Sequence, residues 1–174
     1  MRIKTKTLPL WEILIIVAIV SFVTGLLFPA LTKQRYTAPY LIECGTNILQ
    51  LNSALRMYTS DYDGRYPTED KWCDLLVEYP DVDKSLFICK GAQTKGGQEK
   101  CHFALNPNCE PNSPNDVVLL FDTKGGWNQF GGPELLTTEN HKGKGCNILF
   151  NDGHVEFIRK EELDKLNWGD ERKQ

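Results

Sequence analysis

One stretch of the chain, residues 10–31, is apolar almost throughout and constrains what the rest can form. It carries a single charge, Glu12, near its start. Twenty-two helical residues rise about 33 Å, and the hydrocarbon core of a bilayer is about 30 Å thick. No small-residue cleavage site typical of a signal peptide follows the stretch. We therefore expect a transmembrane helix over residues 10–31 that is retained as an anchor.

The charges on either side of this stretch predict its orientation. The flanking basic residues are Arg2, Lys4, Lys6, Lys33 and Arg35. Because the excess precedes the apolar stretch, the positive-inside rule favours a cytoplasmic N-terminus. We expect a single-pass protein of the inner (cytoplasmic) membrane, with a basic leader over residues 1–9. Residues 32–174 would then form one exported, periplasmic or extracytoplasmic domain.

Charge and cysteine content limit the partners of that domain. The whole chain has a net charge of −3, and nucleic-acid binders usually show a basic face, so we expect no nucleic-acid partner. All six cysteines follow the apolar stretch. In an oxidising compartment an even set predicts disulfides, whereas in the cytosol it would favour metal binding. The sequence does not determine their pairing. The disulfide candidates are Cys44, Cys73, Cys89, Cys101, Cys109 and Cys146.

Helical periodicity dominates the first part of the exported domain. Pro39 predicts a bend or break after the apolar stretch, and Gly64 is placed to end the next helix in a left-handed conformation. Between them the apolar residues are spaced by three and four, which is typical of a helix lying on a core. This stripe consists of Leu41, Cys44, Ile48, Leu51, Leu55, Tyr58 and Tyr62.

Strand signals follow in the second half of the chain. Residues 117–121 form a continuous apolar run that predicts a buried strand, and residues 146–151 and 154–158 flank Asp152-Gly153. An Asp-Gly pair between apolar runs predicts a hairpin with a two-residue type I′ turn. We also expect short helices over residues 70–79 and 160–168. Residues 80–115 are rich in loops and are expected to need disulfides to hold their shape.

These elements predict an α+β fold, with a long N-terminal helix packed on a small antiparallel sheet. His141, Asp152 and His154 are of the residue types that bind zinc, but turn chemistry already explains Asp152, so we expect no metal or other cofactor. A calcium site at Asp61 or Asp63 is a further weak alternative. No phosphate loop, catalytic triad or paired catalytic carboxylates stand out, so we expect no enzyme, although residue types alone leave a Cys-His enzyme open.

Several motifs together resemble the type IV pilin and type II secretion pseudopilin superfamily. The resemblance is to the group with a C-terminal H-x9-DG motif that is abundant in Planctomycetes and Lentisphaerae. The matching stretches are Leu8-Pro-Leu-Trp-Glu12, Phe28-Pro-Ala-Leu31, Cys44-Gly-Thr-Asn-Ile-Leu-Gln-Leu51, Met57 to Pro67, and His141 to Val155 with Asp152-Gly153. It covers residues 7–67 and 140–166.

The resemblance implies a pilin-like fold and a role in assembly. Glu12 takes the place of the glutamate that pairs with the freed N-terminal amine in the family's methylation motif, and a prepilin peptidase is an implied partner. Cleavage would fall between Thr7 and Leu8, where the family has a glycine in the place of Thr7. Ten residues rather than nine separate His141 from Asp152. Because Thr7 stands where the family's peptidase meets a glycine, we expect the leader to be retained.

The predicted function is that of a membrane-anchored, pseudopilin-like structural subunit of a type II secretion or type IV pilus-like assembly. Its partners would be the membrane, other pilin-like subunits and components of the secretion machine. The alternative is an unprocessed envelope protein whose exported domain binds a ligand or a metal. An exported hydrolase is a third hypothesis.

Overall fold

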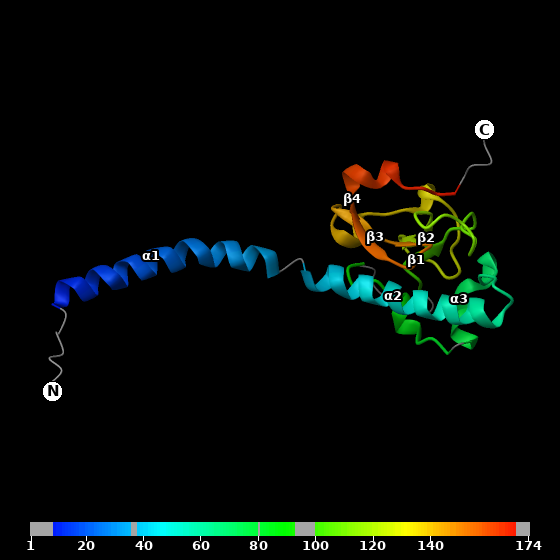
Figure 1. The fold of residues 1–174 in the computed structure, drawn as a ribbon, viewed down its shortest axis with the longest axis horizontal. Coiled ribbons are helices and arrows are strands. Elements are labelled where there is room, and N and C mark those ends of the chain that lie inside the picture. Colours follow the sequence, from blue (N-terminus) through cyan, green and yellow to red (C-terminus); the bar gives the residue numbers. More distant parts are fainter. Residues whose placement is uncertain (1–8, 36–37, 80, 93–99, 170–174) are drawn as a thin grey trace, which may run out of the picture. The chain divides into compact units, whose positions relative to one another are not determined.

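A computed structural model describes residues 9–35, 38–79, 81–92 and 100–169, and the side chains of residues 24–42 are not described. The chain divides into two compact units, residues 1–39 and residues 40–174. Figure 1 shows the elements of each unit along the chain.

The first unit contains one helix, α1 (Leu10–Arg35), which begins directly after Pro9. Proline suits such a position because it has no N–H group to leave unpaired. Glu12 lies in the first turn of α1, where a negative charge interacts favourably with the helix dipole. The apolar side chains described on this helix are exposed, from Leu10 at 78% to Val23 at 45%.

The prediction of a transmembrane helix over residues 10–31 is wrong. Within the described part of the chain, no helix combines the length and the apolar character that a membrane crossing requires. A span needs about 20 apolar residues. The predicted single-pass location in the inner membrane depends on that helix and is therefore wrong as well.

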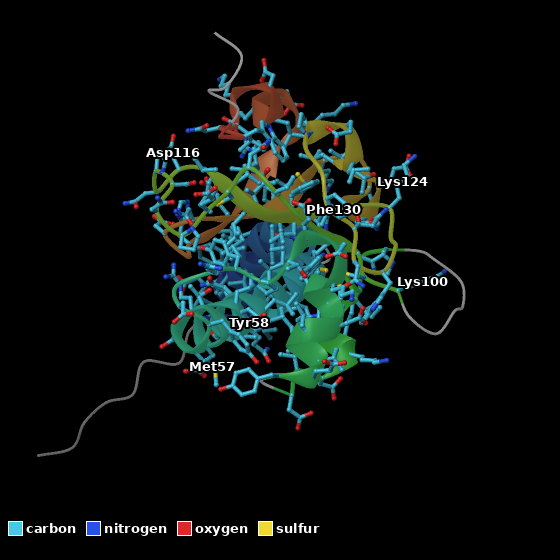
Figure 2. All side chains as sticks on the ribbon, turned by 90° about the vertical axis from the view of Figure 1, so that its right-hand side faces the viewer. Met57, Tyr58, Lys100, Asp116, Lys124 and Phe130 are labelled. Atoms are coloured by element: carbon cyan, nitrogen blue, oxygen red, sulfur yellow. The ribbon has the colours of Figure 1, made fainter. Side chains whose placement is uncertain are left out.

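The second unit is built on helix α2 (Ala38–Asp61), which carries the predicted apolar stripe. Helix α1 ends at Arg35 and α2 begins at Ala38, next to Pro39, and residues 36 and 37 between them lie outside the described residues. Figure 2 labels two neighbours, Tyr58 on the sheet side of α2, 8% exposed, and Met57 on the outer side, 52% exposed. The fully buried members of the stripe are Cys44, Ile48, Leu51 and Leu55, whereas Tyr62, after the end of α2, is exposed.

A four-stranded antiparallel sheet forms the second layer of this unit. Its strands are β1 (Phe103–Leu105), β2 (Val118–Asp122), β3 (Gly145–Phe150) and β4 (Val155–Arg159). They pair in sequence order, so each strand lies beside its neighbour along the chain. The predicted α+β class with an antiparallel sheet is confirmed. The sequence reasoning missed β1, which has only three residues.

Apolar cores lie on both faces of the sheet. The core toward α2 includes Leu120 and Leu149, together with Trp72 from the short helix α3 (Trp72–Glu78). The core on the other face includes Phe121 and is covered by the segment of the 3-10 helix η5 (Lys160–Lys165). Figure 1 shows α2 and η5 on opposite sides of the strands. Burying one leucine or phenylalanine side chain contributes about 1.5–3 kcal/mol, so both faces stabilise the unit.

The hairpin between β3 and β4 is confirmed, but its predicted two-residue type I′ turn is wrong. The Phe150 N–H donates a hydrogen bond to the carbonyl of His154, and the Gly153 N–H donates to the carbonyl of Phe150 at 2.9 Å. The loop between the strands therefore has three residues. A type I′ turn needs positive φ at both central residues. In this loop only Gly153 has it, at +93°. The extra loop residue, Asn151, is held by contacts with α2.

Candidate functional site

A buried group of polar side chains lies between α2 and the sheet. We call it the cysteine–histidine cluster, and its members are Cys44, Cys89, Asp122, His141 and Asn147. All five are buried, with exposed fractions between 0% and 6%. Such a concentration of polar and ionisable groups in an interior is unusual unless the groups bind one another or an ion.

The fold brings the cluster together from separate segments. Cys44 belongs to the core-facing stripe of α2, and Cys89 follows the 3-10 helix η2 (Lys84–Phe87). Side chains alternate between the faces of a strand, so Asp122 points to the same face as Leu120, toward α2. By the same alternation, Asn147 on β3 points to the same face as Leu149, toward α2. His141 ends the 3-10 helix η4 (Glu139–His141), just before β3 begins.

The imidazole of His141 is the centre of the cluster. Its Nε2 atom lies 2.9 Å from Oδ2 of Asp122, 2.9 Å from Nδ2 of Asn147 and 3.7 Å from Sγ of Cys89. The same Oδ2 atom accepts a 2.6 Å hydrogen bond from the backbone N–H of Asn147. The donor atoms of Cys44, Cys89 and His141 all lie within 4.8 Å of one another.

These contacts shift the pKa values of the cluster. The hydrogen bond with Cys89 lowers the pKa of the Cys44 thiol to about 7, against the opposing effect of burial. The same bond, with burial, raises the pKa of Cys89 far above its usual range. Burial lowers the pKa of His141, but the hydrogen bond and charge of Asp122 outweigh it, so that this pKa is raised.

The six cysteines are free thiols, all of them buried, so the prediction of disulfides differs from the structure. Two pairs of thiols are nevertheless in contact: Cys44 with Cys89, and Cys73 with Cys101. The disulfide expectation rested on an exported location, which followed from the transmembrane helix. Only the first pair has a histidine beside it among the described residues.

The other residues singled out from sequence lie elsewhere. Asp152 and His154 pair with each other across the exposed hairpin loop, with 2.6 Å between Oδ1 and Nδ1. His141 lies at the opposite end of β3, about 20 Å away for a six-residue strand. The three residues predicted as weak zinc ligands are therefore not brought together. Thr7 and Leu8, the predicted cleavage position, lie outside the described residues, and Glu12 is half-buried in α1.

Sequence reasoning missed Asp122 and Asn147 as site residues. A signal was present, because Asp122 follows a continuous apolar run and is the first charged group after it. An acidic residue at the end of a buried strand can point into the core only if the core holds a partner for it.

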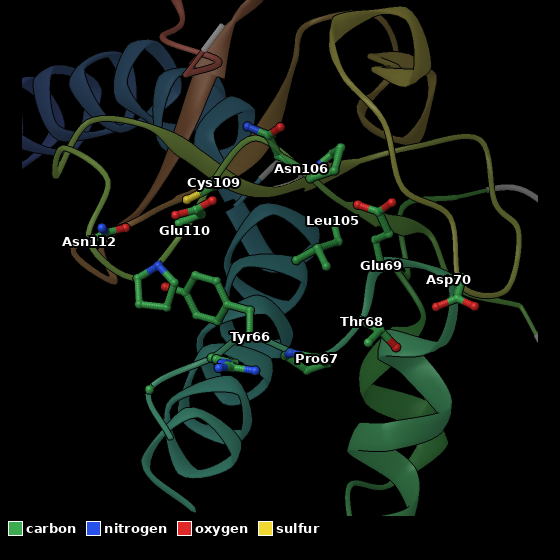
Figure 3. A pocket seen from close by; sticks show the side chains of 14 residues that line it. Tyr66, Pro67, Thr68, Glu69, Asp70, Leu105, Asn106, Cys109, Glu110 and Asn112 are labelled. Atoms are coloured by element: carbon green, nitrogen blue, oxygen red, sulfur yellow. The ribbon is translucent and has the colours of Figure 1, made fainter. Parts of the chain in front are cut away.

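A separate open cleft of about 820 Å³ lies beyond the C-terminal end of α2. Figure 3 shows that its side chains come from residues 64–70 on one side and from residues 105–112 on the other. Three of them are the acidic residues Glu69, Asp70 and Glu110. The cleft contains no histidine, and of the cysteines only Cys109 lines it, so its chemistry differs from that of the cluster.

Comparisons of the chain with protein-family models, with curated proteins and with solved structures found no match.

Proposed function

We propose that the chain is a pilin-like structural subunit that assembles with other copies of itself through α1, and that it is not an enzyme. The motif resemblance of residues 7–67 and 140–166 to pseudopilins supports this role, as part of a type II secretion or type IV pilus-like assembly. The second unit would provide the exposed surface of the assembled subunit.

The exposed apolar surface of α1 is the observation that carries the proposal. Residues 13–20 are exposed at every position, so the apolar surface continues around the whole helix rather than forming one stripe. A helix that is apolar on all sides is stable in water only when neighbours surround it. Equivalent helices from other copies have the same apolar surface and can cover it on several sides.

The second unit supports a structural role through the inaccessibility of its reactive groups. The thiols of Cys44 and Cys89 are 0% exposed and His141 is 6% exposed, so a substrate in solution does not reach them. The combination of cysteine, histidine and aspartate is therefore better suited to holding the fold together than to nucleophilic catalysis, in which the nucleophile must touch the substrate.

The test is assembly of the purified full-length chain, followed by sedimentation and electron microscopy. We expect the parent to form regular oligomers or filaments, and the pair Ile15→Gln and Ile19→Gln to dissociate them. The matched control is Leu49→Gln with Met57→Gln on α2. The exposed fractions are 49% and 57% in the first pair and 45% and 52% in the control.

The two pairs lose similar apolar area, so only a specific role of α1 separates them. A monomeric parent would contradict the proposal. Amorphous aggregates that both pairs of substitutions reduce equally would also contradict it, because that result indicates non-specific hydrophobic association.

A further inference from the structure

Three side chains direct metal-binding atoms toward one point in the interior of the second unit, and a fourth, that of Asp122, lies next to one of them. The sulfur atoms of Cys44 and Cys89 and a ring nitrogen of His141 lie within 4.8 Å of one another, and Nε2 of His141 is 3.7 Å from Sγ of Cys89. Oδ2 of Asp122 lies 2.9 Å from the same Nε2 atom. The three grouped atoms can surround one ion at metal–ligand distances of about 2.0–2.3 Å, and the neighbouring carboxylate must move toward the sulfur atoms to reach the same ion.

Asp122 supplies an independent indication that a positive charge belongs here. Its side chain is 0% exposed, and its Oδ1 atom has no hydrogen-bond partner among the described residues. Leaving a buried carboxylate oxygen unpaired is costly. No lysine or arginine described in the structure forms an ion pair with this carboxylate, and the ion-pair partner that it has is the imidazole of His141.

The hydrogen bonds around His141 compete with one another. Its single Nε2 atom faces a carboxylate oxygen, an amide nitrogen and a sulfur atom. A protonated Nε2 satisfies Asp122 but opposes the amide N–H group of Asn147, and an unprotonated Nε2 does the reverse. A cation bound between Nε2, the carboxylate and the thiolates would remove this conflict, because these three kinds of group then donate electrons to the same ion, while Nδ2 of Asn147 keeps Oδ2 of Asp122 as its acceptor at 3.3 Å.

We propose that Cys44, Cys89 and His141 bind one zinc ion and that the Asp122 carboxylate, next to His141, moves to become its fourth ligand, which gives a closed structural site. Thiolate, imidazole and carboxylate ligands in a fourfold set are those that zinc takes in proteins. All four positions are filled by protein atoms and the site is buried, so no position remains for a substrate. The ion would join α2 and the loop of Cys89 to the sheet.

Asn147 and Gly91 hold this site in place without touching the ion. Both the backbone N–H and the side-chain amide of Asn147 donate to Oδ2 of Asp122, at 2.6 and 3.3 Å, and so orient the carboxylate; Asn147→Ala removes the second of these bonds. Gly91 packs directly against η4, where an added Cβ atom would lie 2.3 Å from the Asn140 carbonyl oxygen and 3.3 Å from Nδ1 of His141. A side chain at residue 91 would therefore push the Cys89 loop away from His141.

The chain contains its own matched control for the cysteines. Cys73 and Cys101 form a second buried thiol pair in contact, but no histidine or carboxylate joins them in a metal-binding group within the described residues. His154 is the control for His141, because it lies in the exposed hairpin loop.

The experiment uses the full-length chain, purified with reducing agent, stripped with a chelator and titrated with Co²⁺ and then Zn²⁺. We expect one Co²⁺ per chain, with the absorption of a tetrahedral thiolate complex, and its displacement by one Zn²⁺. Cys44→Ser and Cys89→Ser should each weaken the thiolate-to-cobalt absorption and the zinc affinity. Cys73→Ser, Cys101→Ser and His154→Ala should leave both unchanged. Asn147→Ala should weaken zinc binding by about 10–100-fold.

Melting of the parent with and without zinc keeps the test decisive if a variant fails to fold. Zinc should raise the melting temperature of the stripped parent. The proposal is overturned if the folded parent binds no Co²⁺ or Zn²⁺, or if Cys44 and Cys89 are recovered from native protein as a disulfide. It is also overturned if Cys73→Ser weakens binding as much as Cys44→Ser does. Assembly through α1 does not enter any of these measurements.

Discussion

The hydroxyl of Tyr66 donates a 2.8 Å hydrogen bond to the side-chain oxygen of Asn151, a residue 85 positions further along the chain. The amide nitrogen of Asn151 in turn donates to the carbonyl of Ser113 at 2.6 Å. One side chain in the β3–β4 loop therefore connects the loop after α2 to the loop before β2. Burial, with a smaller effect of Cys109, raises the pKa of Tyr66 to about 12, so the hydroxyl keeps its proton at neutral pH.

Tyr66→Phe should destabilise the chain by about 1 kcal/mol, because it removes one hydrogen bond and leaves most of the packing. Thermal or urea unfolding measures the change. Tyr62→Phe is the control, because Tyr62 is exposed and stacks on Tyr58 through its ring. Equal losses in the two variants would show that the bond to Asn151 contributes nothing of its own.

Gly153→Val should lower the melting temperature more than His154→Ala does. Valine resists the positive φ of this position, at a cost of about 1–2 kcal/mol, and an added Cβ would lie 2.7 Å from Nη2 of Arg56. Gly143→Val separates the two causes, since Gly143 also has positive φ but nothing within 4 Å of an added Cβ. Reversed effects at residues 153 and 154 would indicate that His154 binds something.

Asp74→Asn should weaken the acid dependence of stability. Hydrogen bonds from the Trp127 indole and the Asn128 amide lower the pKa of Asp74 below its usual value, against the opposing effect of burial. A lowered pKa in the folded state means that the carboxylate stabilises the fold above its unfolded pKa of about 3.9. That stabilisation is lost as pH falls through the folded value.

The measurement is the difference in melting temperature between parent and Asp74→Asn as a function of pH. We expect the variant to melt lower at pH 7 and the difference to shrink in acid. Asp70→Asn, at an exposed neighbouring position, should show little difference at either pH. A difference for Asp74→Asn that is constant with pH would mean that the charge is irrelevant.

Glu12→Gln should scarcely change assembly of the full-length chain. In the family that the sequence resembles, this glutamate pairs with an amine released by cleavage, and Thr7 replaces the glycine that precedes the cut. If the leader is kept, no such amine is formed next to Leu8. Crosslinking of parent and variant, with N-terminal sequencing of the native protein, tests this expectation. A native N-terminus at Leu8, or loss of assembly in Glu12→Gln, would restore the family's ordinary mechanism.

Local periodicity explains which parts of the fold could be predicted. The stripe on α2, the apolar run of β2 and the β3–β4 hairpin each repeat a pattern within a few residues, and all three are present. β1 has three residues and owes its place to pairing with β2, so no repeat marks it. The hairpin loop has three residues rather than the predicted two, because Asn151 is held in it by hydrogen bonds with Tyr66 and Arg56. No local sequence pattern contains these long-range contacts.

The cysteine–histidine cluster could be predicted only in part, because its members come from distant segments. Residue type identifies His141 and the cysteines, but proximity in sequence groups His141 with Asp152 and His154. The strand β3 separates His141 from the other two residues. The nearest polar partners of His141 are Asp122 and Asn147, whose side chains face α2 because side chains alternate between the two faces of β2 and β3.

The hydrogen bond from Nδ2 of Asn52 to the carbonyl of Gly153 spans 101 residues, and it has a consequence for how the protein is made. The four strands of the sheet pair with their sequence neighbours and can form as they leave the ribosome. The apolar stripe of α2 is synthesised long before them. At about 5–20 residues per second, it waits roughly 5–20 s for the hairpin that covers it. During that interval the nascent chain exposes the apolar face of a helix that has no native partner yet, which is the kind of surface that chaperones bind.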